Sequence, residues 1–364
     1  MSASYADSGV DYETLDAAKR DAIRAAQATV GFGALRGAPL DPAFFGEPAA
    51  LFQVGPARLG FVLECLGTKS MVAAAYEELT GEDHFAAIGY DTVAAAVNDC
   101  CCVGALPVVI NAYFATGAAS FYSGTRHRSL VEGFAHGCAD SGATWGGGES
   151  PTLTGLVAPE QIDLAAAVVG LVPEQCEPLG AARLEVGDEI VLVASSGLHA
   201  NGASLVRRVA AGLERGLRTE LPSGRTLGKA VLDPSHIYVD LLAALLEASV
   251  PVHYASHITG HGLRKLMRAE RDLTYRIDTL PAVPEVLAFL SDAAGLSVRE
   301  AYGTFNMGAG FALFVQAGAS GAVLEHAERL GHAAQLAGRV EAGSRRVLLD
   351  PLGIAYESDE LELR

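Results

Sequence analysis

The chain has 364 residues, 50% of them hydrophobic, with a formal charge of -17 and an isoelectric point of about 5.0. This length and apolar content allow a large buried core and indicate two domains rather than one. The acidic balance argues against nucleic acid and anionic membranes as partners, so an anionic ligand would need a local device such as a helix N-terminus or a metal ion.

We expect a cytoplasmic protein without a membrane-spanning segment. No run of about eighteen apolar residues is present, and the first seven residues lack the basic and apolar regions of a signal peptide. The adjacent cysteines at positions 100–102 point in different directions on a predicted helix and cannot close a metal site. The other three cysteines are scattered, and we expect all six to be free and to act as small buried hydrophobic side chains.

Strands and helices alternate in the N-terminal half. Residues 51–54 and 59–63 flank a Gly-Pro turn and predict a hairpin whose second strand delivers Glu64 to its end. The remaining elements predicted there are a helix at 13–28, a glycine-bearing loop at 30–35, a helix at 70–78, a strand at 106–114, a helix at 127–140 and a strand at 162–172.

A predicted helix between Asp91 and about Cys102 contains an acidic residue, Asp99, among apolar side chains. Asp91 precedes an Ala/Val run and indicates an N-cap, and the helix is apolar on every face except at Asn98 and Asp99. Burying an unpaired carboxylate costs several kcal/mol, so Asp99 is expected to meet a cation, a metal ion or hydrogen-bond donors. A purely structural salt bridge is the alternative interpretation.

The stretch from Pro173 to Pro178 breaks this pattern, and we place a domain boundary there, with domains at 1–172 and 173–364. The second half opens on a strand at 189–194, a small-residue loop and a helix at 203–213. Such a loop presents free amides and a positive dipole to an anion, although glycine and serine also serve turn geometry. Residues 253–262 repeat the pattern before a predicted helix at 263–270, and a strand follows at 311–316.

Taken in order, these stretches resemble the aminoimidazole ribonucleotide synthetases, the phosphoribosylformylglycinamidine cyclo-ligases of purine biosynthesis, over nearly the whole chain. The motifs that carry the resemblance are Tyr5-Ala-Asp-Ser-Gly-Val-Asp11, Gly31-Phe-Gly-Ala-Leu35, Gly67-Thr-Lys69, Ile88-Gly-Tyr-Asp91 with Val97-Asn-Asp99, Gly147-Gly-Glu149, the stretch from Ser195 to Arg207, His257-Ile-Thr-Gly260 and Thr304-Phe-Asn-Met-Gly308. The resemblance implies a mixed α/β, two-domain ATP-binding fold whose N-terminal sheets pair across a homodimer.

It also implies an enzyme that uses ATP and Mg2+ to phosphorylate the formamide oxygen of formylglycinamidine ribonucleotide, a phosphoribosyl amidine. The amidine nitrogen then closes the imidazole ring as phosphate leaves. Because an amide oxygen is a poor leaving group, such an enzyme must align it with the γ-phosphoryl group and neutralise the charge.

The resemblance assigns roles to individual residues. Glu64 and Asp99 correspond to the magnesium-binding carboxylates, in keeping with the preference of Mg2+ for oxygen ligands. The implied catalytic residues are His199, Asp99 and Lys69; the implied ATP-binding residues are Gly67, Thr68, Lys69, Asp91 and Glu149; the implied substrate-binding residues are Ser196, Gly197, His199, Asn201, His257 and Thr259. Two alternatives stay open, a solvated lysine at 69 and a histidine at 199 that ties its own turn.

Three positions depart from the family pattern. Glu64-Cys65 stands where Asp-Gly is usual, Thr152 stands where an acidic residue is usual, and His261 replaces a glycine. These changes motivate a second hypothesis, a paralogue that activates another amide or carboxylate in the same cleft. A third hypothesis is a non-catalytic nucleotide-binding regulatory protein, and the presence of all three catalytic candidates counts against it.

Overall fold

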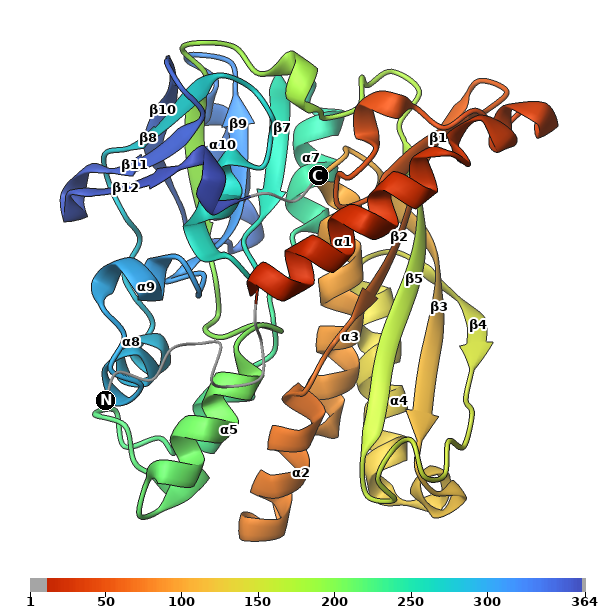
Figure 1. Ribbon diagram of the computed structural model, residues 1–364, viewed down its shortest axis with the longest axis vertical. Coiled ribbons are helices and arrows are strands. Elements are labelled where there is room, and N and C mark those ends of the chain that lie inside the picture. The colour runs from red at the N-terminus through yellow and green to blue at the C-terminus, as the bar shows by residue number, and fades with distance from the viewer. Residues whose placement is uncertain (1–11, 362–364) are drawn as a thin grey trace.

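A computed structural model describes residues 12–361, so the Tyr5–Asp11 motif lies outside the described residues. Two β-sheets organise the chain, one in each half, and they stand side by side in Figure 1. The predicted mixed α/β class with two sheets is confirmed. No helix among the described residues is long and apolar enough to cross a membrane.

The N-terminal sheet has the strand order β1-β2-β5-β3-β4 and is antiparallel except where β4 pairs with β3. The predicted hairpin is confirmed, and Glu64 lies at the end of its second strand. The strands are β1 (Ala50–Val54), β2 (Ala57–Cys65), β3 (Leu106–Thr116), β4 (Thr144–Glu149) and β5 (Ile162–Val172).

The C-terminal sheet has the strand order β12-β11-β8-β10-β6-β9-β7. All seven residues of β9, which lies between β6 and the edge strand β7, are buried, which explains its unbroken apolar run. The strands are β6 (Glu189–Ala194), β7 (Val252–His257), β8 (Leu273–Ile277), β9 (Ala309–Val315), β10 (Ala334–Ala342), β11 (Arg346–Leu349) and β12 (Ile354–Glu357).

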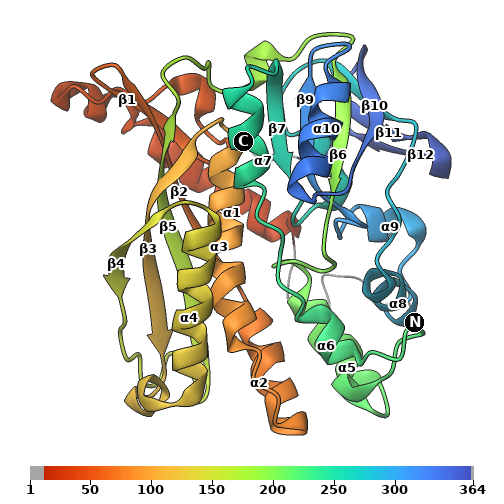
Figure 2. The same cartoon turned by 180° about the vertical axis from the view of Figure 1, so that it is seen from behind.

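Helix α3 (Phe85–Cys101) is buried along its whole length, as its apolar faces predict. It begins at Phe85 rather than Asp91, so the predicted N-cap is wrong, and Asp91 lies in the middle of the helix. Together with α4 (Thr125–Asp140) it covers one face of the N-terminal sheet (Figure 2). The two helices cross closely, because a Cβ on Gly133 would lie 1.8 Å from the carbonyl oxygen of Ala86.

Most of the other predicted helices are confirmed, with two corrections. The predicted loop at 30–35 is a 3-10 helix, Val30–Arg36, and the predicted helix at 263–270 is a 3-10 helix, Gly262–Met267, preceded by the left-handed residue His261. The other α-helices are α1 (Tyr12–Gln27), α2 (Lys69–Thr80), α5 (Ala203–Gly212), α6 (Leu227–Val231), α7 (Val239–Glu247), α8 (Glu285–Ala293), α9 (Val298–Tyr302) and α10 (Ser320–Leu330).

All six cysteines are free, as expected, but not all are buried. Cys176 is half-buried and Cys65 is exposed, so the prediction of a buried side chain is wrong for Cys65. The reason lies in the sheet: alternate residues of β2 point to opposite faces, and Cys65 ends the strand on its outer side.

Candidate functional site

A cavity of about 510 Å³ lies between the two halves of the chain. Its N-terminal wall is residues 64–68, where β2 ends and the chain turns into α2, together with Asp99 of α3. Its C-terminal wall is residues 200–204 before α5 and residues 257–261 after β7. The loops that the sequence singled out in each half therefore meet in one place.

The structure divides the predicted site residues into two groups. Those that line the cavity are Glu64, Gly67, Thr68, Asp99, Asn201, His257 and Thr259. Those that do not line it are Lys69, Asp91, Glu149, Ser196, Gly197 and His199. The two carboxylates, His257 and small or polar loop residues thus line the cavity, whereas Lys69 and His199 do not.

Two carboxyl groups form the acidic side of the cavity. Glu64 and Asp99 are hydrogen-bonded to each other, and burial together with the negative charge of Asp99 raises the pKa of Glu64 to about 8. Burial would also raise the pKa of Asp99, but the hydrogen bond and charge of His257, helped by Lys265, lower it to about 2. In the absence of a metal ion, the pair therefore holds one proton at neutral pH.

The partner that the buried acid requires is a histidine. His257 Nδ1 lies 2.7 Å from Asp99 Oδ1, and both side chains are buried. This contact joins α3 of the N-terminal half to the end of β7 in the C-terminal half. The expectation that Asp99 meets a cation or donor is confirmed, while the residue that supplies the donor could not be chosen from the sequence.

Two cations in the cavity wall were missed by the sequence reasoning. Lys265 is buried and its amine donates to Thr259 Oγ1, and Arg268 Nε lies 3.5 Å from Glu47 Oε2. Burial lowers the pKa of Lys265, although the charge of Asp99 opposes this effect. The only signal in the sequence was the basic character of the stretch after His261, which is equally typical of a solvated surface.

The acid pair suits a magnesium ion better than a closed, all-protein metal site. Within residues 12–361 no three His, Cys, Asp or Glu side chains are arranged to hold a metal. Mg2+ is commonly held by one or two carboxylates together with water and phosphate oxygens, so the two carboxyl groups satisfy its requirement. Burial, and after it the negative charge of Asp99, disfavours ionisation of Glu64, and the charge of a bound divalent cation would oppose both effects.

Lys69 and Asp91 are fully buried and form an ion pair with each other. The Lys69 amine also donates to the backbone carbonyl of Asp233 at 3.2 Å, and Asp91 Oδ1 accepts from the backbone N–H of Ser235 at 2.6 Å. The alternative of a solvated lysine at 69 is therefore wrong. The predicted contact of Lys69 with phosphate stays a prediction, and in this structure its amine is already engaged away from the cavity.

His199 is buried in the turn that leads to the cavity wall. Its backbone is left-handed, with φ 59°, and its Nε2 accepts from the backbone N–H groups of Ser196 at 3.1 Å and His236 at 3.5 Å. Burial, assisted by the neighbouring His257 and His236, holds the pKa of His199 well below its usual range. The alternative that this histidine ties its own turn matches these contacts.

Glu149 ends the edge strand β4 and is exposed on the N-terminal sheet, outside the cavity of its own chain. Cys65, by contrast, lines the cavity mouth, and it does so without a left-handed backbone. The family's usual glycine is therefore not required at this position. Of the three departures noted in the sequence, the Glu64-Cys65 pair and His261 lie in the cavity wall.

Several solved structures share this fold. A thiamine-monophosphate kinase from Stenotrophomonas maltophilia matches with a TM-score of 0.59 at 21% identity, over 92% of this chain and 96% of that chain. A structure described as AaThiL complexed with AMPPCP and TMP matches with a TM-score of 0.58 at 16% identity, over 86% and 90% of the two chains. Similarity at this level of identity concerns the fold alone.

Sequence comparison is more specific. Family models described as the N-terminal and C-terminal domains of AIR synthase related protein match residues 46–172 and 185–350. A phosphoribosylformylglycinamidine cyclo-ligase of Synechococcus elongatus is 32% identical over 345 residues, 93% of this chain and 97% of that protein. One of Anaeromyxobacter sp. is 34% identical over 358 residues, 94% and 97% of the two chains. The chain therefore belongs to the phosphoribosylformylglycinamidine cyclo-ligase family of enzymes.

Proposed function

We propose that this enzyme converts formylglycinamidine ribonucleotide to aminoimidazole ribonucleotide with ATP and Mg2+. The observation that carries the proposal is the cavity between the halves, where the Glu64–Asp99 acid pair faces the cations Lys265 and Arg268. Together with the family relationship, this combination of carboxylates and cations suits a reaction that moves a phosphoryl group between two oxygens.

The residues present divide the work between the two walls. Glu64 and Asp99 would hold Mg2+, which neutralises phosphoryl charge when it is bound. Residues 200–204 lead into α5, whose first turn has no side-chain cap, so its backbone amides are available to a phosphate. Lys265 and Arg268 add positive charge beside the acid pair and would stabilise charge that develops on the transferred group.

We also propose a homodimer formed through the outer face of the N-terminal sheet. Phe61 and Leu63 are 45% and 59% exposed and Leu171 is 39% exposed, all on the face opposite to α3 and α4. This face is turned toward the viewer in Figure 1. Glu149 lies at the exposed edge of the same sheet, so it would reach a nucleotide only in a site shared between two subunits.

Two further assignments belong to this proposal. We place the domain boundary between β5, which ends at Val172, and β6, which begins at Glu189, with domains at 1–172 and 173–364. We place the enzyme in the cytoplasm, because all six cysteines are free and its substrates would be phosphorylated metabolites.

The alternative is a paralogue that activates a different amide or carboxylate. It is favoured by the longer carboxylate of Glu64, by His261 and by Cys65 in place of the usual glycine, three residues that belong to the cavity wall. These side chains change the shape of the acceptor side without removing either the acid pair or the cations. The two enzyme hypotheses therefore differ in the acceptor and agree on ATP.

The deciding experiment measures ADP release and imidazole formation by the purified enzyme with formylglycinamidine ribonucleotide as the added acceptor. We expect ring closure at an ordinary enzymatic rate, roughly one per second or faster. ATP-analogue binding without any ring closure at saturating ATP and Mg2+ would exclude the cyclo-ligase and leave the paralogue.

A matched variant tests the metal-binding carboxylate separately. Asp99→Asn keeps the shape of the side chain but removes its charge, so Mg2+-dependent binding of a non-hydrolysable ATP analogue should be lost. Calorimetry with and without Mg2+ measures this binding. Unchanged affinity and unchanged metal dependence in the folded variant would remove Asp99 from the site.

A further inference from the structure

Residues 233–238, here called the clasp segment, are held by both halves of the chain. On the N-terminal side, Lys69 and Asp91 bind the backbone of Asp233 and Ser235 at 3.2 Å and 2.6 Å. About two helical turns after Asp91 in α3, the side-chain amide of Asn98 donates to the His236 carbonyl at 2.8 Å and accepts from the Tyr238 N–H at 2.9 Å. Buried side chains of α2 and α3 therefore fix both ends of the segment.

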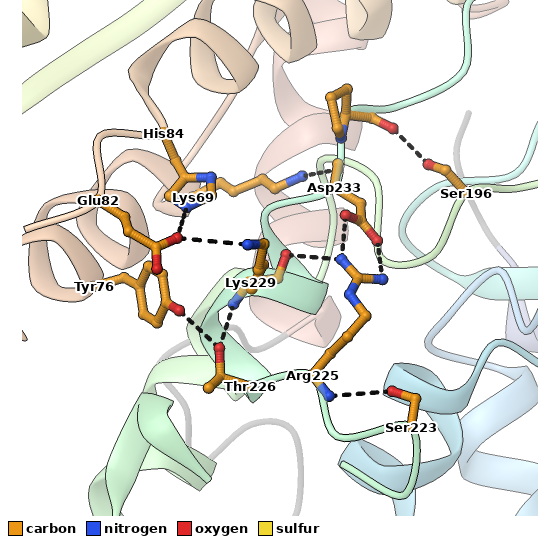
Figure 3. A network of polar contacts seen from close by, with 11 residues as sticks. Lys69, Tyr76, Glu82, His84, Ser196, Ser223, Arg225, Thr226, Lys229 and Asp233 are labelled. Carbon is orange, nitrogen blue, oxygen red and sulfur yellow. Dashed lines mark hydrogen bonds and ion pairs between the residues drawn. The ribbon is translucent and has the colours of Figure 1, made fainter. Parts of the chain in front are cut away.

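The other side of the clasp segment is bound to the turn at 194–199. Ser196 Oγ donates to the Pro234 carbonyl at 2.6 Å, and the His236 N–H donates to His199 Nε2 at 3.5 Å. The Tyr238 hydroxyl donates to the Ala194 carbonyl at 2.8 Å. Figure 3 shows that Lys69 and Ser196 approach the region of Asp233 from different sides.

The approach to the clasp segment is also tied across the two halves. Arg225 binds both carboxylate oxygens of Asp233, at 2.9 Å and 2.6 Å, and the Tyr76 hydroxyl of α2 lies 2.7 Å from Thr226 Oγ1 (Figure 3). The Tyr76–Thr226 contact continues the attachment of α2 to the C-terminal half beyond the buried ion pair, and the Arg225–Asp233 bonds tie the approach to the segment itself.

Both attachments end at the cavity. The turn at 194–199 runs directly into residues 200–204, which form the C-terminal wall, and Asn98 is followed by Asp99 of the acid pair. We propose that Lys69, Asp91 and His199 are positioning residues: through the clasp segment they hold the 200–204 wall in register with Glu64 and Asp99. For its activity readout this inference rests on the proposed function.

The ion pair gives a test that separates positioning from contact with phosphate. Lys69→Met leaves the Asp91 carboxylate buried without its cation, which strongly destabilises a protein. Adding Asp91→Asn removes that charge and keeps an oxygen that can accept from the Ser235 N–H. Lys69→Met should therefore lower the melting temperature and the turnover number, and the double variant should recover most of both.

A direct phosphate contact predicts a different pattern. In that case the double variant would recover its melting temperature, but its turnover would stay as low as that of Lys69→Met, because the ammonium is still missing. That result would overturn the positioning role of Lys69. The role would also be overturned if Lys69→Met and the double variant both kept the wild-type turnover and the wild-type KM for ATP.

A milder variant keeps the inference testable if Lys69→Met does not fold. Asn98→Ala removes two bonds to the clasp segment without leaving a buried charge, and Thr92→Ala, on the same helix, is the control because its hydroxyl bonds only to the Ile88 carbonyl. We expect faster hydrogen exchange at 233–238 in Asn98→Ala and a turnover lower by up to about a hundredfold, the cost of a small misplacement. The inference would be overturned if Asn98→Ala showed the same hydrogen-exchange rate at 233–238 and the same turnover as the wild type.

The exchange and melting measurements need no substrate, so they report on the clasp even if formylglycinamidine ribonucleotide is not the acceptor. Loss of the clasp contacts should also weaken binding of the ATP analogue, because the 200–204 wall and the acid pair line the same proposed ATP site. Failure of the proposed function would instead appear as absent ring closure in the wild type with normal exchange at 233–238.

Discussion

Glu64 holds a proton at neutral pH, and this has a consequence for stability. Its pKa of about 8 in the folded protein lies above its ordinary value of 4.5, since burial and Asp99 both oppose ionisation. The stability that this carboxyl group contributes is fully present below about pH 4.5 and is lost as the pH rises through about 8.

We predict that Glu64→Gln, in metal-free buffer, is less sensitive to alkaline pH than the wild type. The amide keeps the hydrogen bond to Asp99 but cannot ionise, so the variant should gain on the order of 2 kcal/mol relative to wild type between about pH 5 and about pH 9. Urea unfolding at both pH values measures the difference. Parallel pH profiles for the two proteins would show that Glu64 is already ionised.

His199 makes a prediction of the opposite kind. Because burial keeps its imidazole neutral across the working range, it should contribute no ionisation to the pH dependence of turnover. In His199→Asn, a residue that tolerates the left-handed backbone, turnover should fall while the shape of the pH profile stays the same. If a titration step disappears from the profile, His199 exchanges a proton during catalysis.

At the scale of elements, the crossing of α3 and α4 positions the acid pair. Asp99 is held near the end of β2 because α3 packs both against the N-terminal sheet and against α4 beside it. Gly89 and Gly133 permit this approach, since a Cβ at either position would lie 2.1 Å or 1.8 Å from a backbone oxygen of the other helix.

We predict that Gly133→Ala separates these helices and lowers the free energy of unfolding by about 3 kcal/mol, the upper range for overpacking. The matched control is Gly321→Ala in α10, where a Cβ meets no atom within 4 Å and alanine favours the helix by about 1 kcal/mol. Denaturant unfolding of both variants measures the contrast. Equal effects at the two positions would mean that α3 and α4 can adjust without cost.

At the scale of the molecule, the outer face of the N-terminal sheet is the surface through which we propose that subunits associate. Phe61 pairs with Val169 across β2 and β5, and both point away from α3 and α4. An exposed apolar face of this kind is typical of an interface.

We predict that Phe61→Lys converts the proposed dimer to a monomer, because a charge at the centre of an apolar interface must be desolvated. Leu336→Lys on β10, where the leucine is 43% exposed, is the control and should leave the mass unchanged. Sedimentation velocity measures both. A monomeric wild type, or a dimer that survives Phe61→Lys, would contradict this interface.

The sequence by itself determined most elements and the cavity-lining loops. Alternation in β2, the unbroken apolar run of β9 and the apolar faces of α3 depend on local periodicity, and the structure agrees with them. Prediction from the sequence failed where local signals compete. The residues before Asp91 also favour a helix, so α3 begins earlier than expected. His261 has a left-handed backbone, and a short 3-10 helix follows it in place of the expected α-helix.

Tertiary structure alone decided which charges meet. Lys69 at the start of α2 and Asp91 in the middle of α3 are 22 residues apart in sequence, yet they pair inside the protein, and Asp99 finds its donor in His257 of the other half. Whether a lysine or arginine is exposed to solvent or buried in an ion pair depends on the residues that pack against it. The residue type alone does not determine this packing. Sequence patterns therefore located the loops of the site, whereas the contacts between the two halves determined which side chains those loops present.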